Sequence, residues 1–433
     1  MTVQTDRGPG LEDARTDASV VGLYIHVPFC RFKCYYCDFN TYAGIEGLIA
    51  PYIAALSTEI LRWGASLAAT GGERPRLSSV YFGGGTPSLL SPPQVGQVLA
   101  AVRKAFDLTD DAEITMEANP ESVDANAMRE RRSVGINRVS MGAQTFDDDQ
   151  LRLLGRLHDA SRIESAFGDL HRAGFDNLSL DLMYGLPDQS LEGWDRSVNR
   201  ALELAPEHLS LYSLTVEERT PFHRWIEVDG TMTVPDADAA ADMYELASDL
   251  LATSGYQQYE ISNWSLPGKE SRHNVMYWRN EPFVGVGPGA HSFVGHARFS
   301  VESSPRDYIK RLDELDGCES SAIDLVQGRR LTSIDEVRSI APITGFDPYT
   351  RDMERRETLI LGLRLNAGIS ETEYRARFGS TPTDLFRPEL QEAIGSGLLE
   401  RRGKDRLVLT TRGRLLANEV FVLLLESRDP GNG

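Results

Sequence analysis

Six short runs rich in Val, Leu, Ile and aromatic residues alternate with helix-like stretches along the first half of the chain. The strand-like runs lie at 22–27, 78–84, 112–120, 137–144, 177–187 and 208–217, and the helix-like stretches lie at about 51–67, 93–106, 124–132, 160–173 and 191–204. This alternation is typical of parallel strands joined by crossover helices. Six units are too few for a barrel of eight, so the sequence predicts an α/β fold with a partial (βα)6 TIM-like barrel.

The sequence changes character after about residue 300. The stretch 356–370 reads as an amphipathic helix that ends in a turn. The stretch 390–425 reads as a helix, two short strands and a helix, which is the order of a winged-helix module. The polar start lacks the apolar core of a signal peptide. We therefore expect a disordered tail at 1–20, a core barrel at 21–300, a connecting segment at 301–345 and a C-terminal α+β winged-helix-like domain at 346–433.

The charge balance narrows the classes of partner. The chain has 45 Lys and Arg against 64 Asp and Glu, a formal net charge of −19. A nucleic-acid binder needs a basic face, so this balance argues against nucleic acid and favours a packing or docking role for the winged-helix-like domain. No apolar run approaches the roughly 20 residues of a transmembrane helix. We expect a cytoplasmic protein that is not an integral membrane protein.

Three of the four cysteines fall within eight residues, in the spacing C-x3-C-x2-C: Cys30, Cys34 and Cys37. In a reducing compartment such clustering indicates metal rather than disulfides. A [4Fe–4S] cluster normally takes four Cys ligands, so three leave one iron open. The amino and carboxylate groups of S-adenosylmethionine can chelate that iron, and the reduced cluster can then generate an adenosyl radical.

Zinc is the alternative for this site. A structural zinc needs a fourth Cys or His, and only His26 is close in the sequence. His26 lies in the strand before the loop, where we expect it to face the barrel interior or stabilise the loop. The isolated Cys318 is expected to be inert packing.

Several motifs resemble one family. They are YIHVPFCRFKCYYCDF, FGGGTPS, MEANPES, RVSMGAQTFDDDQLRLLGRLH, DLMYGLP and HNVMYW. Together they are similar to the coproporphyrinogen III oxidase-like branch of radical S-adenosylmethionine (SAM) proteins, over about residues 20–425. The resemblance implies a radical SAM barrel that holds the cluster and SAM.

That branch contains two groups that this sequence separates. The oxygen-independent coproporphyrinogen III dehydrogenases carry a fourth Cys two residues after the third and a longer N-terminal arm; here the position is Phe39. The haem chaperones have Phe there and the motif HNxxYW, which this chain has at 273–278. The resemblance therefore implies a haem chaperone, with the dehydrogenase as the alternative, and leaves open whether the chain is an enzyme. Modification of RNA or DNA is a third hypothesis, weakened by the acidic balance.

The residues that would contact SAM stand at strand ends, where ligands of parallel α/β folds bind. The glycine turn permits close backbone approach, Glu117 can accept hydrogen bonds, and Arg156 offers a fork for a carboxylate. Taken one at a time, each of these polar residues fits a structural role. Their shared placement at strand ends favours binding of a ligand. The resemblance assigns SAM to Tyr24, Tyr36, Gly84, Gly85, Thr86, Glu117, Gln144, Arg156 and Asp181, with Thr215 a weaker match.

The HNxxYW motif contributes the candidate haem site. His273 can ligate iron, and Tyr277 and Trp278 can line a porphyrin pocket. Spacing alone favours a turn packed by aromatic rings with His273 hydrogen-bonded internally; the resemblance favours haem. It implies three bound groups, namely the [4Fe–4S] cluster, SAM and haem, and haem-accepting proteins as partners, respiratory ones among them. A homodimer is left open.

Overall fold

The computed structural model describes residues 20–68, 73–315, 317, 322–323 and 330–426. The tail expected at 1–20 lies outside these ranges except for its last residue, and Cys318 lies outside them as well.

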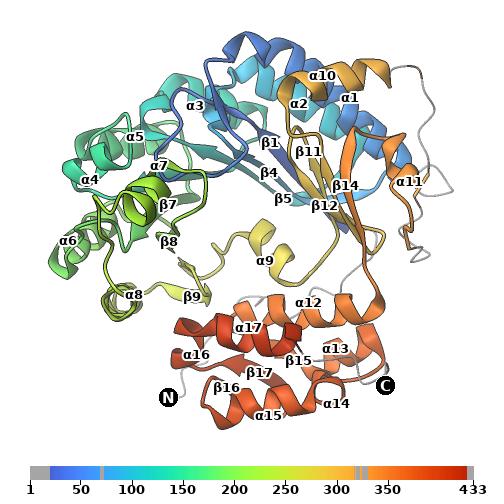
Figure 1. Cartoon of the computed structure of the whole chain (residues 1–433). Coiled ribbons are helices and arrows are strands. Elements are labelled where there is room, and N and C mark those ends of the chain that lie inside the picture. The colour runs from blue at the N-terminus through green and yellow to red at the C-terminus, as the bar shows by residue number, and fades with distance from the viewer. Residues whose placement is uncertain (1–19, 69–72, 316, 318–321, 324–329, 427–433) are drawn as a thin grey trace, which may run out of the picture.

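Six neighbouring parallel strands form the centre of the described fold. They follow one another in the sheet in chain order: β1 (Val20–Val27), β4 (Arg76–Gly84), β5 (Asp107–Ala118), β6 (Arg138–Gln144), β7 (Leu178–Tyr184) and β8 (His208–Ser213). The helices that connect them lie outside the curved sheet (Figure 1): α1 (Ile49–Leu67), α2 (Pro92–Ala105), α3 (Ala125–Val134), α4 (Asp148–Leu153), α5 (Ala160–Arg172) and α6 (Leu191–Glu203). The predicted partial (βα)6 barrel is confirmed.

The two faces of each strand differ, because successive side chains in a strand point to opposite sides. In β6 the side chains of Val139, Met141 and Ala143 are fully buried in the hydrophobic core shared with the helices. The alternate residues of β6 face the barrel interior, where they line a cavity: Arg138, Ser140, Gly142 and Gln144. The barrel therefore has an apolar outer layer and a polar interior.

Side-chain caps fix the points at which the helices begin. Asp124 accepts hydrogen bonds from the backbone N–H groups of Asn126 and Ala127 at the start of α3. Ser190 caps α6 in the same way, through the N–H of Gly193. Such caps stabilise a helix by about 1 kcal/mol and hold the preceding loop close to the strand end.

The sheet extends beyond the six strands to twelve in the described residues. β11 (Phe283–Val286) pairs with β1 in parallel, and β12 (His291–Val294), β13 (Ala297–Val301) and β14 (Ile343–Pro348) continue from it antiparallel. At the other edge β10 (Asn263–Ser265) and β9 (Gln257–Glu260) follow β8. The segment 301–345, expected to be a connection, contains α10 (Pro305–Glu314), which packs on α1, and the first half of β14. The expected boundary at residue 346 falls inside β14.

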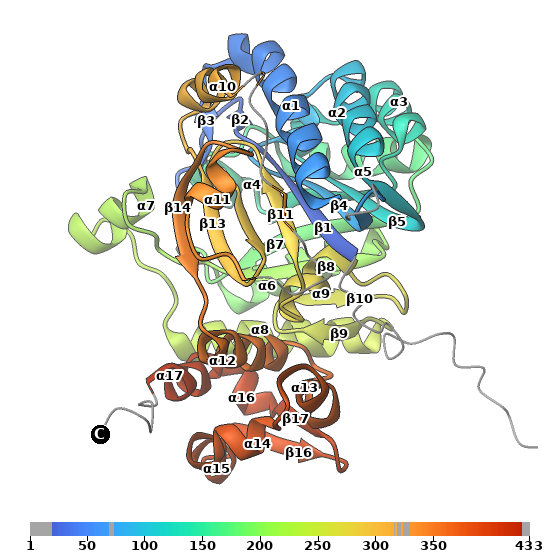
Figure 2. The same cartoon turned by 90° about the vertical axis from the view of Figure 1, so that its right-hand side faces the viewer.

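A short helix, α9 (Arg272–Trp278), lies between the barrel and the C-terminal domain (Figure 2). It contacts β4 of the barrel on one side and α12 (Arg351–Arg364) on the other. The sequence of α9 is the HNxxYW motif, so this motif joins the two parts of the chain.

The C-terminal domain has its own hydrophobic core and a three-stranded sheet in the order β15-β17-β16. Its core includes Leu363, Phe386 and Leu407. The expected order of helix, two strands and helix is present, and the domain is α+β. After α12 its elements are β15 (Ile369–Ser370), α13 (Glu371–Phe378), α14 (Pro382–Leu385), α15 (Arg387–Gly395), β16 (Leu399–Arg402), β17 (Arg406–Leu409), α16 (Thr411–Leu415) and α17 (Ala417–Glu426).

One buried carboxylate in α12 is bonded to several cations. Glu354 lies 2.7 Å from His296 Nδ1 on the barrel side, 3.0 Å from Arg330 and 3.1 Å from Arg377. Although burial works in the opposite direction, the hydrogen bonds from His296 and Arg377 lower the pKa of Glu354 to about 2. The charge of Glu354 therefore helps to hold the C-terminal domain against the barrel.

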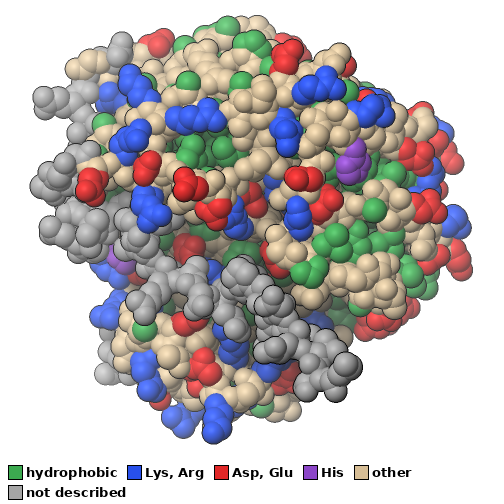
Figure 3. All heavy atoms as spheres, turned by 180° about the vertical axis from the view of Figure 1, so that it is seen from behind, with side chains coloured by type: hydrophobic (Ala, Val, Ile, Leu, Met, Phe, Trp, Pro, Cys, Tyr) green, Lys and Arg blue, Asp and Glu red, His purple; other side chains and the backbone are tan. Residues whose placement is uncertain are grey.

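No helix in the described part of the chain is both long and apolar enough to cross a membrane. On the back of the molecule, Lys and Arg side chains are interspersed with Asp and Glu side chains (Figure 3).

Candidate functional site

The barrel encloses a cavity of about 390 Å³ that is lined by the cysteine loop and by the inward faces of the parallel strands. Its position agrees with the rule that ligands of parallel α/β folds bind at the carboxyl ends of strands. Of the residues expected to hold the cluster or SAM, the cavity is lined by Cys30, Cys34, Cys37, Tyr36, Gly84, Gly85, Glu117, Gln144, Arg156 and Asp181.

The cysteine loop is fastened to the barrel by His26 and Asn40. His26 Nε2 lies 2.9 Å from the carbonyl oxygen of Asn40, and its Nδ1 lies 3.1 Å from the Tyr24 hydroxyl. The Asn40 amide donates to the carbonyl of Pro288, after β11, at 2.9 Å. Both ring nitrogens of His26 are bonded within the protein, and Nε2 holds the cysteine loop. Stabilisation of the loop is one of the two roles expected for this residue from the sequence.

The three thiols of the loop are the candidate metal ligands of the chain. All three are free and partly exposed, and burial raises the pKa of Cys30 and Cys37. Within the described ranges no three His, Cys, Asp or Glu side chains converge on one point as a single ion requires. A [4Fe–4S] cluster binds each thiolate through a different iron, so its ligands need not converge.

A chain of hydrogen bonds joins two of the cysteines through three residues, which follow β4, β5 and α4. Thr86 donates to Cys30 Sγ at 3.6 Å and accepts from the Asn119 amide at 3.1 Å. Arg156 donates to Asn119 Oδ1 at 2.8 Å and to Cys34 Sγ at 3.6 Å. Hydrogen bonds to the sulfurs are one means by which a protein tunes a cluster.

Asn119 is a member of this network that the sequence analysis did not single out. It follows Glu117 at the end of β5, two residues along the chain, and so faces the same side. The signal that could have identified it is this spacing, inside the motif MEANPES.

The glycine turn at the end of β4 is required by close packing. Gly84 has φ +107°, and a Cβ there would stand 2.6 Å from the His26 ring. A Cβ on Gly85 would stand 2.6 Å from the Phe29 carbonyl oxygen and 3.1 Å from Cys30 Sγ. The absent side chains let the cysteine loop pack on the turn and leave its backbone next to the cavity.

Two carboxyl groups face the cavity at mid-depth. Glu117 accepts hydrogen bonds from the Tyr81 hydroxyl at 2.8 Å and from the Gly84 N–H at 3.1 Å. Burial raises the pKa of Glu117 to about 7 and raises that of Asp181 as well. Asp181 accepts from the Ser140 hydroxyl at 3.1 Å. Each carboxyl therefore has hydrogen-bond donors of its own.

Two of the residues expected to contact SAM, Tyr24 and Thr86, do not line the cavity. Tyr24 stacks on Tyr81, and Thr86 is buried next to Cys30. Thr215 is two residues past the end of β8 and is exposed. Gln144 lines the cavity with φ +67°, an unusual conformation for a residue other than glycine. SAM contacts by all of these remain predictions.

His273 is fully engaged within the protein. It is 1% exposed, its Nδ1 lies 2.8 Å from Ser79 Oγ, and its Nε2 lies 2.8 Å from the Tyr277 hydroxyl. Burial lowers the pKa of His273 to about 3, so the ring is neutral. The arrangement is the internally bonded turn that spacing alone favours, and haem ligation by His273 requires the bond to Tyr277 to open.

The other motif residues also pack internally, with one exception. The Tyr277 ring packs edge-on against Phe283, and the Arg364 guanidinium lies 4.4 Å from the Trp278 ring centre. Asn274 instead lines the barrel cavity. The motif thus reaches the cavity through its asparagine.

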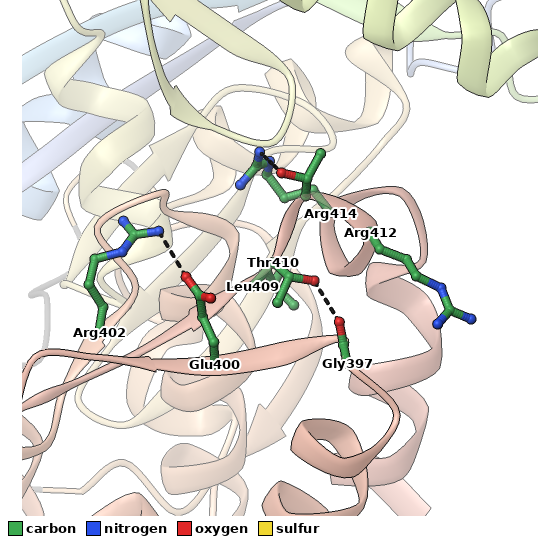
Figure 4. A pocket seen from close by; sticks show the side chains of 8 residues that line it. Gly397, Glu400, Arg402, Leu409, Thr410, Arg412 and Arg414 are labelled. Carbon is green, nitrogen blue, oxygen red and sulfur yellow. Dashed lines mark hydrogen bonds and ion pairs between the residues drawn. The ribbon is translucent and has the colours of Figure 1, made fainter.

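A second hollow, of about 480 Å³, lies on the C-terminal domain beside β16, β17 and α16 (Figure 4). Arg402 pairs with Glu400 at 3.4 Å, and Thr410 donates to the Gly397 carbonyl at 2.7 Å. Arg414 donates to the Thr411 hydroxyl at 3.2 Å, and Arg412 to the Ser396 carbonyl at 3.2 Å. The three arginines of this hollow are already bonded to protein oxygens.

Two family models match the chain. Residues 24–201 match the radical SAM superfamily, and residues 349–416 match the HemN C-terminal domain. In overall fold the chain resembles the solved coproporphyrinogen III oxidase HemN of Escherichia coli, with a TM-score of 0.76, 23% identity, and coverage of 94% of this chain and 92% of that one.

Curated relatives match over nearly their whole length. A protein named "Heme chaperone HemW" from Bacillus subtilis is 35% identical over 92% of this chain and 97% of its own. Proteins of the same name from Mycobacterium tuberculosis and Escherichia coli are 36% and 35% identical, over 96% and 94% of this chain. The matched part of this chain therefore includes both the barrel and the C-terminal domain.

Proposed function

Because the chain belongs to the HemW family of the radical SAM superfamily, we propose that it is a haem chaperone, which binds haem and transfers it to acceptor proteins. The observation that carries this proposal is Phe39. Its ring is 61% exposed at the lining of the barrel cavity, in the position where the dehydrogenases of this branch carry a fourth cysteine. Sequence identities of 35% and 36% to proteins named haem chaperone, over 92% and 96% of this chain, support the same assignment.

We propose that Cys30, Cys34 and Cys37 hold a [4Fe–4S] cluster with one open iron. When bound, the cluster and SAM would supply one-electron chemistry. Thr86 and Arg156 would orient the sulfurs through the hydrogen bonds already present. The residues that would contact SAM are Tyr24, Tyr36, Gly84, Gly85, Thr86, Glu117, Gln144, Arg156 and Asp181.

Haem is the cargo in this proposal. His273 would ligate the iron after release from Tyr277, with Tyr277 and Trp278 beside the porphyrin. Because α9 contacts both the barrel and the C-terminal domain, an acceptor protein would approach the motif at the junction of the two parts. In this proposal the acceptors include respiratory proteins. We also propose that the protein is cytoplasmic, because the three clustered cysteines suit the reducing conditions there.

Anaerobic reconstitution of the full chain with iron and sulfide, followed by titration with haem, tests the proposal. The wild-type protein should give a Soret band at one haem per chain and should pass the haem to an added haem-free acceptor. A variant with all three cysteines changed to Ser should lose the iron but keep the Soret band. A wild-type protein that binds no haem would contradict the proposal.

The same sample decides between chaperone and dehydrogenase. Coproporphyrinogen III, SAM and a low-potential reductant should give no protoporphyrinogen. Multiple turnovers in this assay would instead assign the chain to catalysis. The variant Phe39→Cys is the matched control, since it restores the cysteine pattern of the dehydrogenases at an exposed position.

A further inference from the structure

Among the residues that the structure describes, one arginine of the barrel interior has no hydrogen-bond partner. Arg138 begins β6 and is aligned with Thr115 of β5, whereas Ser140, two residues further on, is aligned with Glu117. Because inward residues of a strand are two apart, Arg138 lies one layer deeper in the barrel than Ser140. Its side chain lines the cavity and is 2% exposed.

The contrast with Arg131 shows why this is unusual. Arg131 is 4% exposed, and its guanidinium donates to the carbonyl oxygens of Ser88 at 2.9 Å and Leu90 at 2.7 Å. Within the described ranges Arg138 forms no hydrogen bond and no ion pair; the Nε of both arginines is buried without a partner, so the two differ in their terminal nitrogens, which are bonded only in Arg131. A guanidinium has five N–H donors, and leaving it buried and unpaired is costly.

The nearest carboxyl groups do not satisfy this charge. Glu117 and Asp181 feel the charge of Arg138 but are hydrogen-bonded to other groups, Tyr81 and Gly84 in one case and Ser140 in the other. Neither forms an ion pair with Arg138.

A second unpaired polar group lines the same cavity. The backbone N–H of Asn274 bonds to the Ser271 hydroxyl, but in the described part of the chain its side-chain amide has no hydrogen-bond partner. Arg138 lines the same cavity as Asn274. The charge of Arg138 also contributes to the low pKa of His273, the residue before Asn274 in α9. Arg138 and Asn274 thus approach the cavity from a strand and from the helix that closes it.

We propose that Arg138 and Asn274 form a carboxylate-binding subsite on the floor of the barrel cavity. A guanidinium matches a carboxylate in charge and in planar geometry, and an amide N–H can add a third donor. Arg156 lies next to Cys34, at the cluster, and is bonded to Asn119 and the Gly142 carbonyl. The two arginines therefore mark separate positions for anionic groups.

The carboxylate has two possible sources, a propionate side chain of haem or a small free carboxylate. Only the haem source rests on the proposed function. The reconstituted full chain with saturating SAM is titrated with sodium propionate by calorimetry, and with haem and haem dimethyl ester by Soret absorbance. The variants are Arg138→Gln, Arg138→Lys and Asn274→Ala, and Arg131→Gln is the matched control.

Propionate should bind the wild type, and Arg138→Gln should weaken it at least tenfold. Asn274→Ala should weaken it severalfold, Arg138→Lys should retain part of the affinity, and Arg131→Gln should lower thermal stability without changing propionate binding. If haem is the source, the wild type should prefer haem to its ester about tenfold and Arg138→Gln should not.

If the wild type binds haem and haem dimethyl ester with equal affinity while propionate binding still depends on Arg138, the result would support the subsite for a small carboxylate. Absence of haem binding with the same propionate result would remove the proposed function and leave the subsite in place. Propionate binding that is absent or independent of Arg138, together with an unchanged preference for haem over its ester, would overturn the proposal. If Arg138→Gln does not fold, Arg138→Lys and Asn274→Ala decide the question.

Discussion

His273 Nε2 lies 2.8 Å from the hydroxyl oxygen of Tyr277, one helical turn further along α9. The residue expected to bind iron and a residue expected to line the haem pocket are therefore bonded to each other. Haem must compete with this bond, so the bond should set part of the haem affinity.

Replacing Tyr277 with Phe removes the competing hydroxyl and frees His273 Nε2. Since a hydrogen bond contributes about 1 kcal/mol, haem should bind about fivefold more tightly to Tyr277→Phe, measured by Soret titration. Tyr256→Phe is the control, because that buried hydroxyl donates to the Pro206 carbonyl far from the motif. His273→Ala should lose at least tenfold in affinity; unchanged affinity there would exclude His273 as the iron ligand.

Arg156 contacts Cys34 and Asn119 through different nitrogens, which a lysine cannot do. Arg156→Lys should therefore weaken SAM binding about tenfold or more, measured by equilibrium dialysis on reconstituted protein. Arg152→Lys, at an exposed position on the preceding helix, is the matched control and should bind SAM normally. Wild-type affinity in Arg156→Lys would mean that the fork is not needed.

Glu59 is fully buried in α1, accepts hydrogen bonds from Tyr308 and Gly287, and has a pKa raised to about 7 by burial. A raised pKa in the folded state means that the folded protein keeps the proton while the unfolded chain loses it, so stability falls as pH rises from about 4.5 to about 7. Glu59→Gln carries no such proton. The free energy of unfolding of this variant, relative to wild type, should rise across that range by up to about 3 kcal/mol in urea titrations. A flat difference would show that Glu59 titrates normally.

The contribution of Glu354 to stability has the opposite pH dependence, because the pKa of its carboxyl is lowered to about 2. Its contribution is complete above about pH 4.5 and is lost as pH falls toward 2. Glu354→Ala should reduce the free energy of unfolding at pH 7 by about 2 kcal/mol, since it leaves two partly exposed arginines without their partner. Glu392→Ala, at an exposed position of α15, should change it by no more than about 0.5 kcal/mol. Equal effects of the two variants would contradict a role in holding the domains together.

The sequence predicts the six parallel strands well because each is a short run rich in Val, Leu, Ile or aromatic residues, and helix-like stretches separate successive runs. It does not predict the strands from β9 to β14, which have only three to six residues each. Pairing of β11 with β1 depends on contacts across more than 250 residues of chain, which local patterns do not encode.

The candidate site also contains residues that the sequence identifies and residues that it does not. Residues with distinctive chemistry at strand ends, such as Cys30 and Glu117, are identified from motifs. Arg138 lies at the start of a strand rather than its end, and only the alternation backward from Gln144 places it inside the barrel. The internal bonding of His273 depends on Ser79 of a distant strand, so no local pattern distinguishes a ligand from a packed histidine.

The position of β1 between β4 and β11 has a consequence for how the chain matures in the cell. During synthesis from the N-terminus, the cysteine loop leaves the ribosome early, but Gly22 finds its partner Phe283 only after most of the protein has been made. Until then one edge of β1 is open to other strands, and the wall behind the cysteines is incomplete. Iron–sulfur insertion is therefore expected to be a late, post-translational event that follows closure of the sheet by β11.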